Sequence, residues 1–216
     1  MSSIRVLDDL FLKSSRCIDN AITVFSNFSL GWRAMAHVMT FNKVSLEKLL
    51  ELKDCGCREL FIGIESGSPK ILKSIHKTHD INTIESNLFK VLDSGIELKC
   101  YFIYGFPSET VEDFAQTYGL ASRLKEKASS VGVGFRTSVF QFRPYHGTEI
   151  FHTLTNSGLE ISGISQIDGN PDLSSLVGRL QFNFHSGNYA DAPVNVLYDF
   201  IHKTANLSSS KEWGLE

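Results

Sequence analysis

The chain has 216 residues, of which 42% are hydrophobic and 21% charged, and its formal net charge is −3. This composition excludes an intrinsically disordered chain, and the slightly negative charge argues against nucleic-acid binding through a strong positive field. No apolar stretch approaches the roughly 20 residues of a membrane span, and the first residues lack the pattern of a signal peptide. We therefore expect a soluble, cytoplasmic protein with neither a membrane nor a nucleic acid as partner.

The four cysteines do not form a recognisable disulfide or metal pattern. They stand at Cys17, Cys55, Cys57 and Cys100. They are too few and too scattered for a disulfide scaffold at this length, and no C-x2-C pair is present for a zinc site. Free cysteine is among the most buried residue types. We expect reduced, buried thiols and no metal site.

Strand-like and helix-like segments alternate along the chain. Strands are expected at 4–7, 30–38, 60–64, 98–104 and 133–142. Helices are expected at 14–25, 45–55, 70–75, 81–92, 111–127 and 194–204, with the sequence after 143 otherwise less regular. Ser45 is a suitable N-cap for the second helix and Gly56 a suitable stop. Such alternation indicates parallel strands joined by right-handed helical crossovers, and hence an α/β fold.

Two architectures fit this alternation: an open doubly wound sheet, and a barrel or part of one. A dinucleotide-binding sheet predicts G-x-G-x-x-G after the first strand, where this chain has no glycine. In a barrel the working residues stand at the carboxyl ends of the strands. Five strand ends here carry candidate groups: Asp8, Asp9, His37, Glu65, Ser66, Gly105, Glu109, Gln141 and Arg143. The pattern therefore favours a site at the ends of a curved parallel sheet.

The segment GIESGSP, residues 63–69, follows an apolar strand. Glu65 should project into a cleft, where a carboxylate can hold a ribose diol through two short hydrogen bonds. Ser68 and Pro69 are explained by a helix start, as N-cap and first helical residue. A helix start does not explain Glu65.

The segment YFIYGFPSET, residues 101–110, is a second strand end. Gly105 permits a flat ring to approach the backbone closely, and Ile103 and Phe106 would supply apolar walls for it. The alternative is an ordinary strand-to-helix turn in which Thr110 caps the next helix.

Taken together, these segments resemble the radical S-adenosylmethionine (SAM) superfamily, most closely the branch often fused to a cobalamin-binding domain. The resemblance covers about residues 4–151 and rests on the order and spacing of Asp8-Asp9-Leu10-Phe11, GCRELFIGIESGSPKILKSIHKTHD, GIELKCYFIYGFPSET and PYHGTEIF. It implies a partial (β/α) barrel of about five parallel strands in residues 1–151. Residues 152–216 would form a C-terminal extension with a turn-rich segment and a final helix.

The resemblance also implies roles for individual residues. Asp8 and Asp9 would meet the amino group of the SAM methionine, and Glu65 and Ser66 would face the ribose. Ile103, Gly105 and Phe106 would lie beside the adenine, with Gln141 and Arg143 near the adenine or the substrate. An intact member of the family cleaves SAM to a 5′-deoxyadenosyl radical that acts on a substrate, here expected to be a small molecule. In the cobalamin branch a methyl transfer often follows.

The departures from the family pattern are informative. The [4Fe-4S] cluster of such enzymes is held by C-x3-C-x2-C, which this sequence lacks, and His37 stands where the branch often has Arg. The sequence begins at what resembles the family's second strand. We therefore expect part of a truncated or split protein, or one completed by a partner that supplies the missing part. Alone, it should bind SAM weakly and not cleave it.

Two other functions stay open at this point. One is a non-radical barrel enzyme in which Asp9 and Glu65 act as an acid–base pair. The other is a non-catalytic binding subunit, or pseudoenzyme, that a partner completes.

Overall fold

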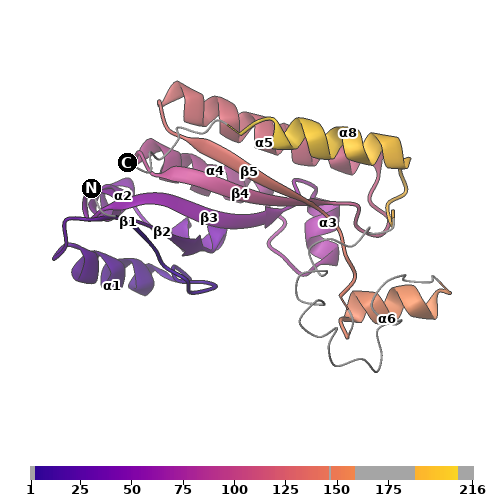
Figure 1. Ribbon diagram of the computed structural model, residues 1–216, viewed down its shortest axis with the longest axis horizontal. Coiled ribbons are helices and arrows are strands. Elements are labelled where there is room, and N and C mark those ends of the chain that lie inside the picture. Colours follow the sequence, from indigo (N-terminus) through magenta and orange to yellow (C-terminus); the bar gives the residue numbers. More distant parts are fainter. Residues whose placement is uncertain (1–2, 146, 159–187, 209–216) are drawn as a thin grey trace, which may run out of the picture.

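The computed structural model describes residues 3–145, 147–158 and 188–208 (Figure 1). Its centre is one parallel sheet of five strands in the order β1-β2-β3-β4-β5. The strands are β1 (Ser3–Arg5), β2 (Gly31–Ala36), β3 (Cys57–Glu65), β4 (Glu97–Tyr104) and β5 (Phe135–Gln141). Each strand is added on the same side of the previous one, whereas a doubly wound sheet reverses direction. The sheet is therefore the wall of a partial (β/α) barrel, as the sequence predicts.

Helices separate consecutive strands and also follow the last one. They are α1 (Ser15–Phe25), η1 (Val38–Phe41), α2 (Leu46–Asp54), α3 (Pro69–Ser74), α4 (Ile81–Asp93), α5 (Val111–Ser130), α6 (Glu149–Asn156) and α8 (Val194–Ala205). The sequence predicts all of them to within a few residues except the 3₁₀ turn η1 and the helix α6. Ser45 caps α2 as expected, and Gly56 follows it with a φ of 100°. No helix in the described ranges has the length and apolar character needed to cross a membrane.

The two faces of the sheet differ, and β4 shows this most clearly. Every second side chain of β4 is fully buried in the main hydrophobic core: Leu98, Cys100, Phe102 and Tyr104. The alternate side chains of β4, Lys99, Tyr101 and Ile103, are only half-buried. Because successive strand residues point to opposite faces, the helices cover one face and leave the other open. We call this second face the open face.

The final helix packs on the covered face. Helix α8 lies along α5 and β5 (Figure 1). The Tyr104 hydroxyl lies 2.7 Å from the Thr204 hydroxyl, and the Phe200 ring contacts the rings of Tyr104 and Phe114. Residues on both sides of the predicted boundary at 151 thus share one core, and the division into 1–151 and 152–216 stays a prediction.

Candidate functional site

The carboxyl end of β3 presents Glu65 in a strained conformation. Its φ is 69°, in the left-handed region that non-glycine residues rarely adopt, and the register between β3 and β4 shifts just before it. One carboxylate oxygen, Oε1, accepts a hydrogen bond of 2.7 Å from Lys77 Nζ. The other, Oε2, has no partner among the described residues, and the side chain is 20% exposed. Strain of this kind is typical of functional positions.

The charge of Lys77 also acts on His37 at the end of β2. His37 follows β2 directly, and its Nδ1 accepts from the Met39 amide at the start of η1. Partial burial lowers the pKa of His37, and the positive charge of Lys77 lowers it further. His37 therefore caps a helical turn beside the Glu65–Lys77 pair.

The carboxyl end of β4 turns at Gly105, whose φ is 95°. Glu109 is fully buried beneath this turn, and its Oε2 accepts from the amides of Gly105 (2.6 Å) and Phe106 (2.9 Å). Its other oxygen, Oε1, is buried without a hydrogen-bond partner in the described part of the chain. Burial raises the pKa of Glu109 to about 7, against the smaller opposing effect of the two amides. Glu109 thus holds the turn and does not point into the open site.

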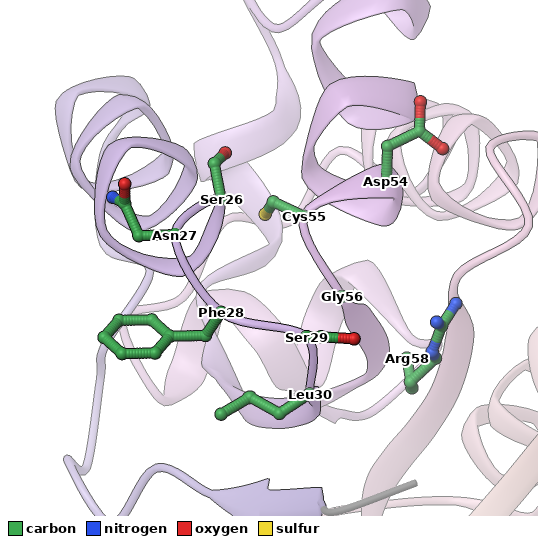
Figure 2. Close-up of a pocket in the computed structure, with 9 residues that line it drawn as sticks. All are labelled: Ser26, Asn27, Phe28, Ser29, Leu30, Asp54, Cys55, Gly56 and Arg58. Carbon is green, nitrogen blue, oxygen red and sulfur yellow. The ribbon is translucent and has the colours of Figure 1, made fainter.

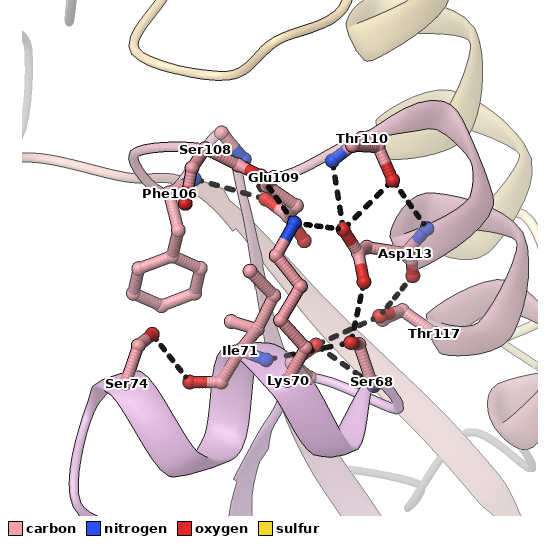
Figure 3. Close-up of polar contacts among 12 residues, drawn as sticks. Ser68, Lys70, Ile71, Ser74, Phe106, Ser108, Glu109, Thr110, Asp113 and Thr117 are labelled. Atoms are coloured by element: carbon pink, nitrogen blue, oxygen red, sulfur yellow. Dashed lines mark hydrogen bonds and ion pairs between the residues drawn. The ribbon is translucent and has the colours of Figure 1, made fainter.

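A polar network joins the two turns (Figure 3). Ser68 Oγ donates to Asp113 Oδ1 over 2.6 Å, and Lys70 Nζ donates to Asp113 Oδ2 (3.1 Å) and to the Ser108 carbonyl (2.6 Å). Asp113 and Thr110 also form a capping box at the start of α5. Burial acts to raise the pKa of Asp113, but hydrogen bonds from Ser68 and Thr110 hold it below its ordinary value. Asp113 therefore stays charged and fixes both helix starts.

Ser66 belongs to this network and not to the open site. It is fully buried, its hydroxyl lies 3.0 Å from the Thr117 hydroxyl, and it accepts from the Ser68 amide. The Gly67 amide also donates to Thr117. A Cβ on Gly67 would lie 2.5 Å from the Gln116 carbonyl oxygen, so only glycine fits against α5 here.

An apolar wall lies beside the two turns. The rings of Phe106 and Phe142 pack 4.9 Å apart, in a cluster that also contains Ile71 and Leu154, with Ile103 against it. Gly105 brings the turn close to β5, since a Cβ there would lie 3.8 Å from Gln141 Cγ. Arg143 is half-buried two residues after β5. The structure thus brings together Glu65, Ile103, Gly105, Phe106, Gln141 and Arg143 at three neighbouring strand ends.

Asp8 and Asp9 lie elsewhere. The chain leaves the sheet after Val6, whose amide bonds to Arg33, and rejoins it at Leu12, which pairs with Ala36. Both aspartates are exposed on the intervening loop, where Asp8 Oδ1 accepts from the Leu10 amide. The predicted first strand therefore ends earlier than the sequence indicates, and no described contact joins either aspartate to the other predicted site residues.

The described residues provide groups that suit a nucleoside but none that suit a cluster. The Glu65 carboxylate, with one unpaired oxygen, and the apolar wall stand at neighbouring strand ends, and groups of these kinds can hold a ribose diol and an adenine ring. No three of the described histidines, cysteines and acidic residues lie close enough to hold a metal ion. Cys57 and Cys100 are fully buried, and burial raises the pKa of both thiols, so they are inert as ligands.

A cavity of about 430 Å³ opens at the opposite end of the strands (Figure 2). Residues of the turns before β2 and β3, among them Phe28 and Cys55, line it together with Arg58 of β3. It faces away from Glu65 and is separate from the candidate site.

Sequence reasoning missed Lys77 and the charged residues of the open face. Lys77 is 12 residues from Glu65 in a loop after α3, and nothing local marks their contact. The sequence of β4, ELKCYFIY, could have revealed the charged residues of the open face. Its alternation places Lys99 and Tyr101 on the face opposite Leu98, Cys100 and Phe102.

Comparison with known proteins identifies similar chains. Residues 21–121 match the family model described as the radical SAM superfamily. An uncharacterized methyltransferase of Pyrococcus horikoshii is 33% identical over 127 residues, which are 57% of this chain and 27% of that protein. A tRNA-2-methylthio-N(6)-dimethylallyladenosine synthase of Protochlamydia amoebophila is 32% identical over 118 residues, 52% of this chain and 24% of that protein. The chain thus spans about a quarter of these relatives.

The cobalamin-dependent S-adenosylmethionine radical enzyme OxsB has a similar fold. Its apo structure superposes with a TM-score of 0.59 over 80% of this chain and 30% of that one, at 14% identity. At this identity the likeness concerns the fold, and it agrees with the curved five-stranded wall described above.

Proposed function

We propose that this chain, whose residues 21–121 match the radical SAM superfamily model, is a member of that superfamily and binds S-adenosylmethionine at the carboxyl ends of β3, β4 and β5. The chain's part in the reaction is then to hold and orient this cofactor. The rest of the machinery of a full-length relative would lie outside the described residues.

Glu65 is the observation that carries the proposal. Its backbone is held at a φ of 69°, its Oε1 is held by Lys77, and its Oε2 has no partner in the described ranges. A carboxylate so oriented accepts hydrogen bonds from a vicinal diol, as the ribose of SAM offers. Such charge-assisted bonds are about twice as strong as neutral ones.

The apolar wall and the β4 turn supply the second half of the proposed site. Ile103 and Phe106 would flank the adenine, and the Gly105 backbone allows the ring to approach. Glu109 acts as a positioning residue, because its Oε2 fixes the amides of Gly105 and Phe106. Gln141 and Arg143 are proposed to contact the adenine edge or the substrate. Ser66 would act only through the turn that it stabilises.

The proposed reaction class is radical SAM chemistry, with transfer of a methyl or related group to a small molecule as the favoured outcome. The names of the relatives, a methyltransferase and a tRNA-2-methylthio-N(6)-dimethylallyladenosine synthase, support transfer of a methyl or related group, as does the fold likeness to the cobalamin-dependent OxsB, whereas the small-molecule acceptor is our own expectation. A [4Fe-4S] cluster in an intact enzyme supplies the electron that cleaves SAM, and cobalamin can carry the methyl group. Since no described residues fit the cluster, no step through it is assigned to this chain.

Asp8 and Asp9 are kept as proposed acceptors for the amino group of SAM, although both are exposed on their loop. No described contact joins Asp9 to Glu65, so nothing here favours an acid–base pair. A binding subunit completed by a partner would use the same SAM site. It would differ in showing no deoxyadenosine formation when joined with a protein that carries C-x3-C-x2-C.

Equilibrium dialysis of the full chain with SAM and with S-adenosylhomocysteine tests the proposal. The Glu65→Gln variant removes the charge but keeps the size, and it should weaken both ligands about tenfold, the value of one or two charge-assisted hydrogen bonds. Glu126→Gln is the matched control, because Glu126 is exposed on α5, and it should bind like the wild type. Equal binding by the two variants, or none by the wild type, would overturn the proposal.

A further inference from the structure

The open face of the sheet gathers four cations around a single buried carboxylate. Arg5, Arg33, Lys99 and Arg136 come from four different strands, β1, β2, β4 and β5. Glu59 on β3 is the acid among them and is fully buried. These five side chains carry three excess positive charges, although the whole chain has a net charge of −3. Glu97, two residues before Lys99 on β4 and in register with Glu59, is a further acid on this face.

Glu59 does not neutralise this cluster. Both of its oxygens are held by Arg136, at 2.5 to 2.8 Å, and Arg33 lies farther away at 3.8 Å. Within the described part of the chain, Arg5 and Lys99 have no ion-pair partner. Their charged groups lie instead over the Phe61 ring, 5.1 Å and 5.9 Å from its centre, with Arg33 also at 5.9 Å. Three cations thus lie within about 6 Å of the centre of one ring, which attracts each of them only weakly.

The mutual repulsion is visible at Lys99. Partial burial lowers its pKa, and the nearby Arg136, Arg5 and Arg33 lower it further, against the opposing effect of Glu59. Like charges held this close are costly unless an anion joins them. Arg33 and Arg136 stay partly exposed, with side-chain exposures of 42% and 30%, so an anion from solvent reaches them.

An aromatic surface continues from the cations toward the candidate site. Tyr101 and Phe140 stack with their rings 6.2 Å apart and nearly parallel, and Lys99 lies 5.5 Å from the Tyr101 ring. Phe140 pairs in register with Ile103, which belongs to the apolar wall. Along β4 and β5, toward their carboxyl ends, the cation cluster is therefore followed by the aromatic pair and then by the apolar wall.

We propose that this face binds an organic anion, with its carboxylate or phosphate group among Arg5, Arg33 and Lys99 and its flat apolar body on Tyr101 and Phe140. Glu65 is the fourth residue after Phe61 on β3, and at about 3.3 Å per residue the anionic group therefore lies about 13 Å from the strand ends. The assignment of this anion as the substrate rests on the proposed function, whereas the anion site itself does not.

Phenyl phosphate, benzoate and the neutral benzyl alcohol serve as probes in calorimetric or NMR titrations of the full chain at low salt. At least one of the two anions should bind the wild type more tightly than benzyl alcohol does. The Arg5→Gln/Lys99→Gln variant should lose about tenfold in affinity for that anion. Arg16→Gln/Lys43→Gln removes one Arg and one Lys that are exposed on other surfaces, and it should bind like the wild type.

Three outcomes would overturn the proposal: equal affinity for the anions and benzyl alcohol, equal loss in both double variants, or no binding of either anion. If the Arg5→Gln/Lys99→Gln variant does not fold, titrations of the wild type test the proposal instead. Added salt should then lower the affinity for the two anions and leave the affinity for benzyl alcohol unchanged. S-adenosylhomocysteine binding in the same variants separates the two proposals. Anion binding without S-adenosylhomocysteine binding would keep the anion site and remove the proposed cofactor site.

Discussion

The turn after β3 and the turn after β4 are built alike but use their glutamates in opposite ways. Each follows a buried strand, contains a residue with positive φ, and leads into a helix with a hydroxyl N-cap, Ser68 or Thr110. Glu65 points outward with one oxygen unpaired, whereas Glu109 is fully buried and holds its own turn. The comparison teaches that burial decides whether a glutamate at a strand end supports its own turn, as Glu109 does, or keeps a carboxylate oxygen unpaired, as Glu65 does.

The largest expected effect on stability comes from replacing Asp113, which links the two turns. Asp113 accepts hydrogen bonds from Ser68, Lys70 and Thr110 (Figure 3). Asp113→Ala removes the acceptor of the Ser68 hydroxyl and of the Thr110 amide and leaves Lys70 only the Ser108 carbonyl, so it should lower the free energy of unfolding by about 3 kcal/mol. Denaturant titration measures the loss. Asp199→Ala removes an exposed aspartate that pairs only with Lys203 on α8, and it should cost less than about 0.5 kcal/mol. Equal losses would contradict a network that joins the turns.

A smaller effect should appear as a pH dependence at Glu109. Because its pKa is raised to about 7 in the folded chain, from an ordinary value of 4.5, the folded chain holds this proton more tightly than the unfolded chain. Its contribution to stability is therefore fully present below about pH 4.5 and is lost as the pH rises through about 7. The shift corresponds to about 2 kcal/mol, after allowance for hydration of the site.

Glu109→Gln tests this pH dependence, because glutamine can still accept from the amides of Gly105 and Phe106 without titrating. Denaturant titrations at several pH values should show the wild type losing about 2 kcal/mol more than this variant between pH 5 and pH 8. Glu126→Gln, on the exposed side of α5, should keep the wild-type slope. Parallel curves for the wild type and Glu109→Gln would show that Glu109 is ionised throughout.

The difference between the two glutamates is also where sequence reasoning reaches its limit. Periodicity and capping residues predict β3, β4, α3 and α5, since Ser68, Pro69 and Thr110 act locally. Whether Glu65 or Glu109 is buried depends on α5 and on the chain near Asp191, whose amide bonds to the Glu109 carbonyl. Such contacts join residues far apart in the chain, and no local pattern encodes them.

The end of the first strand is also set by a distant contact that the local sequence does not predict. Asp8 and Asp9 resemble a strand end in sequence, but the chain rejoins the sheet at Leu12 beside Ala36. The detour exists because Leu12 is fully buried in the core, which outweighs the local signal of two aspartates. Helix α6 was missed because Pro144 and Gly147 indicate a turn, and its start at Glu149 lies just beyond them.

The smallest expected effect on stability concerns the strain at Glu65. A φ of 69° costs a glutamate about 1 kcal/mol, whereas asparagine tolerates the left-handed region. Glu65→Asn should therefore raise the free energy of unfolding by about 0.5 kcal/mol, after loss of the partly exposed pair with Lys77. The same substitution shortens the side chain and removes its charge, so it should weaken S-adenosylhomocysteine binding at least as much as Glu65→Gln does.

Glu65→Gln is the control for this prediction, because it removes the charge and keeps the strain. Thermal and denaturant unfolding should rank the asparagine variant above the wild type, and the wild type level with or slightly above the glutamine variant. If asparagine gives no gain over glutamine, the left-handed backbone at position 65 stores no strain. A gain in stability together with a loss of binding would mean that the turn after β3 keeps its conformation for the ligand and not for the fold, in contrast with the turn that Glu109 supports.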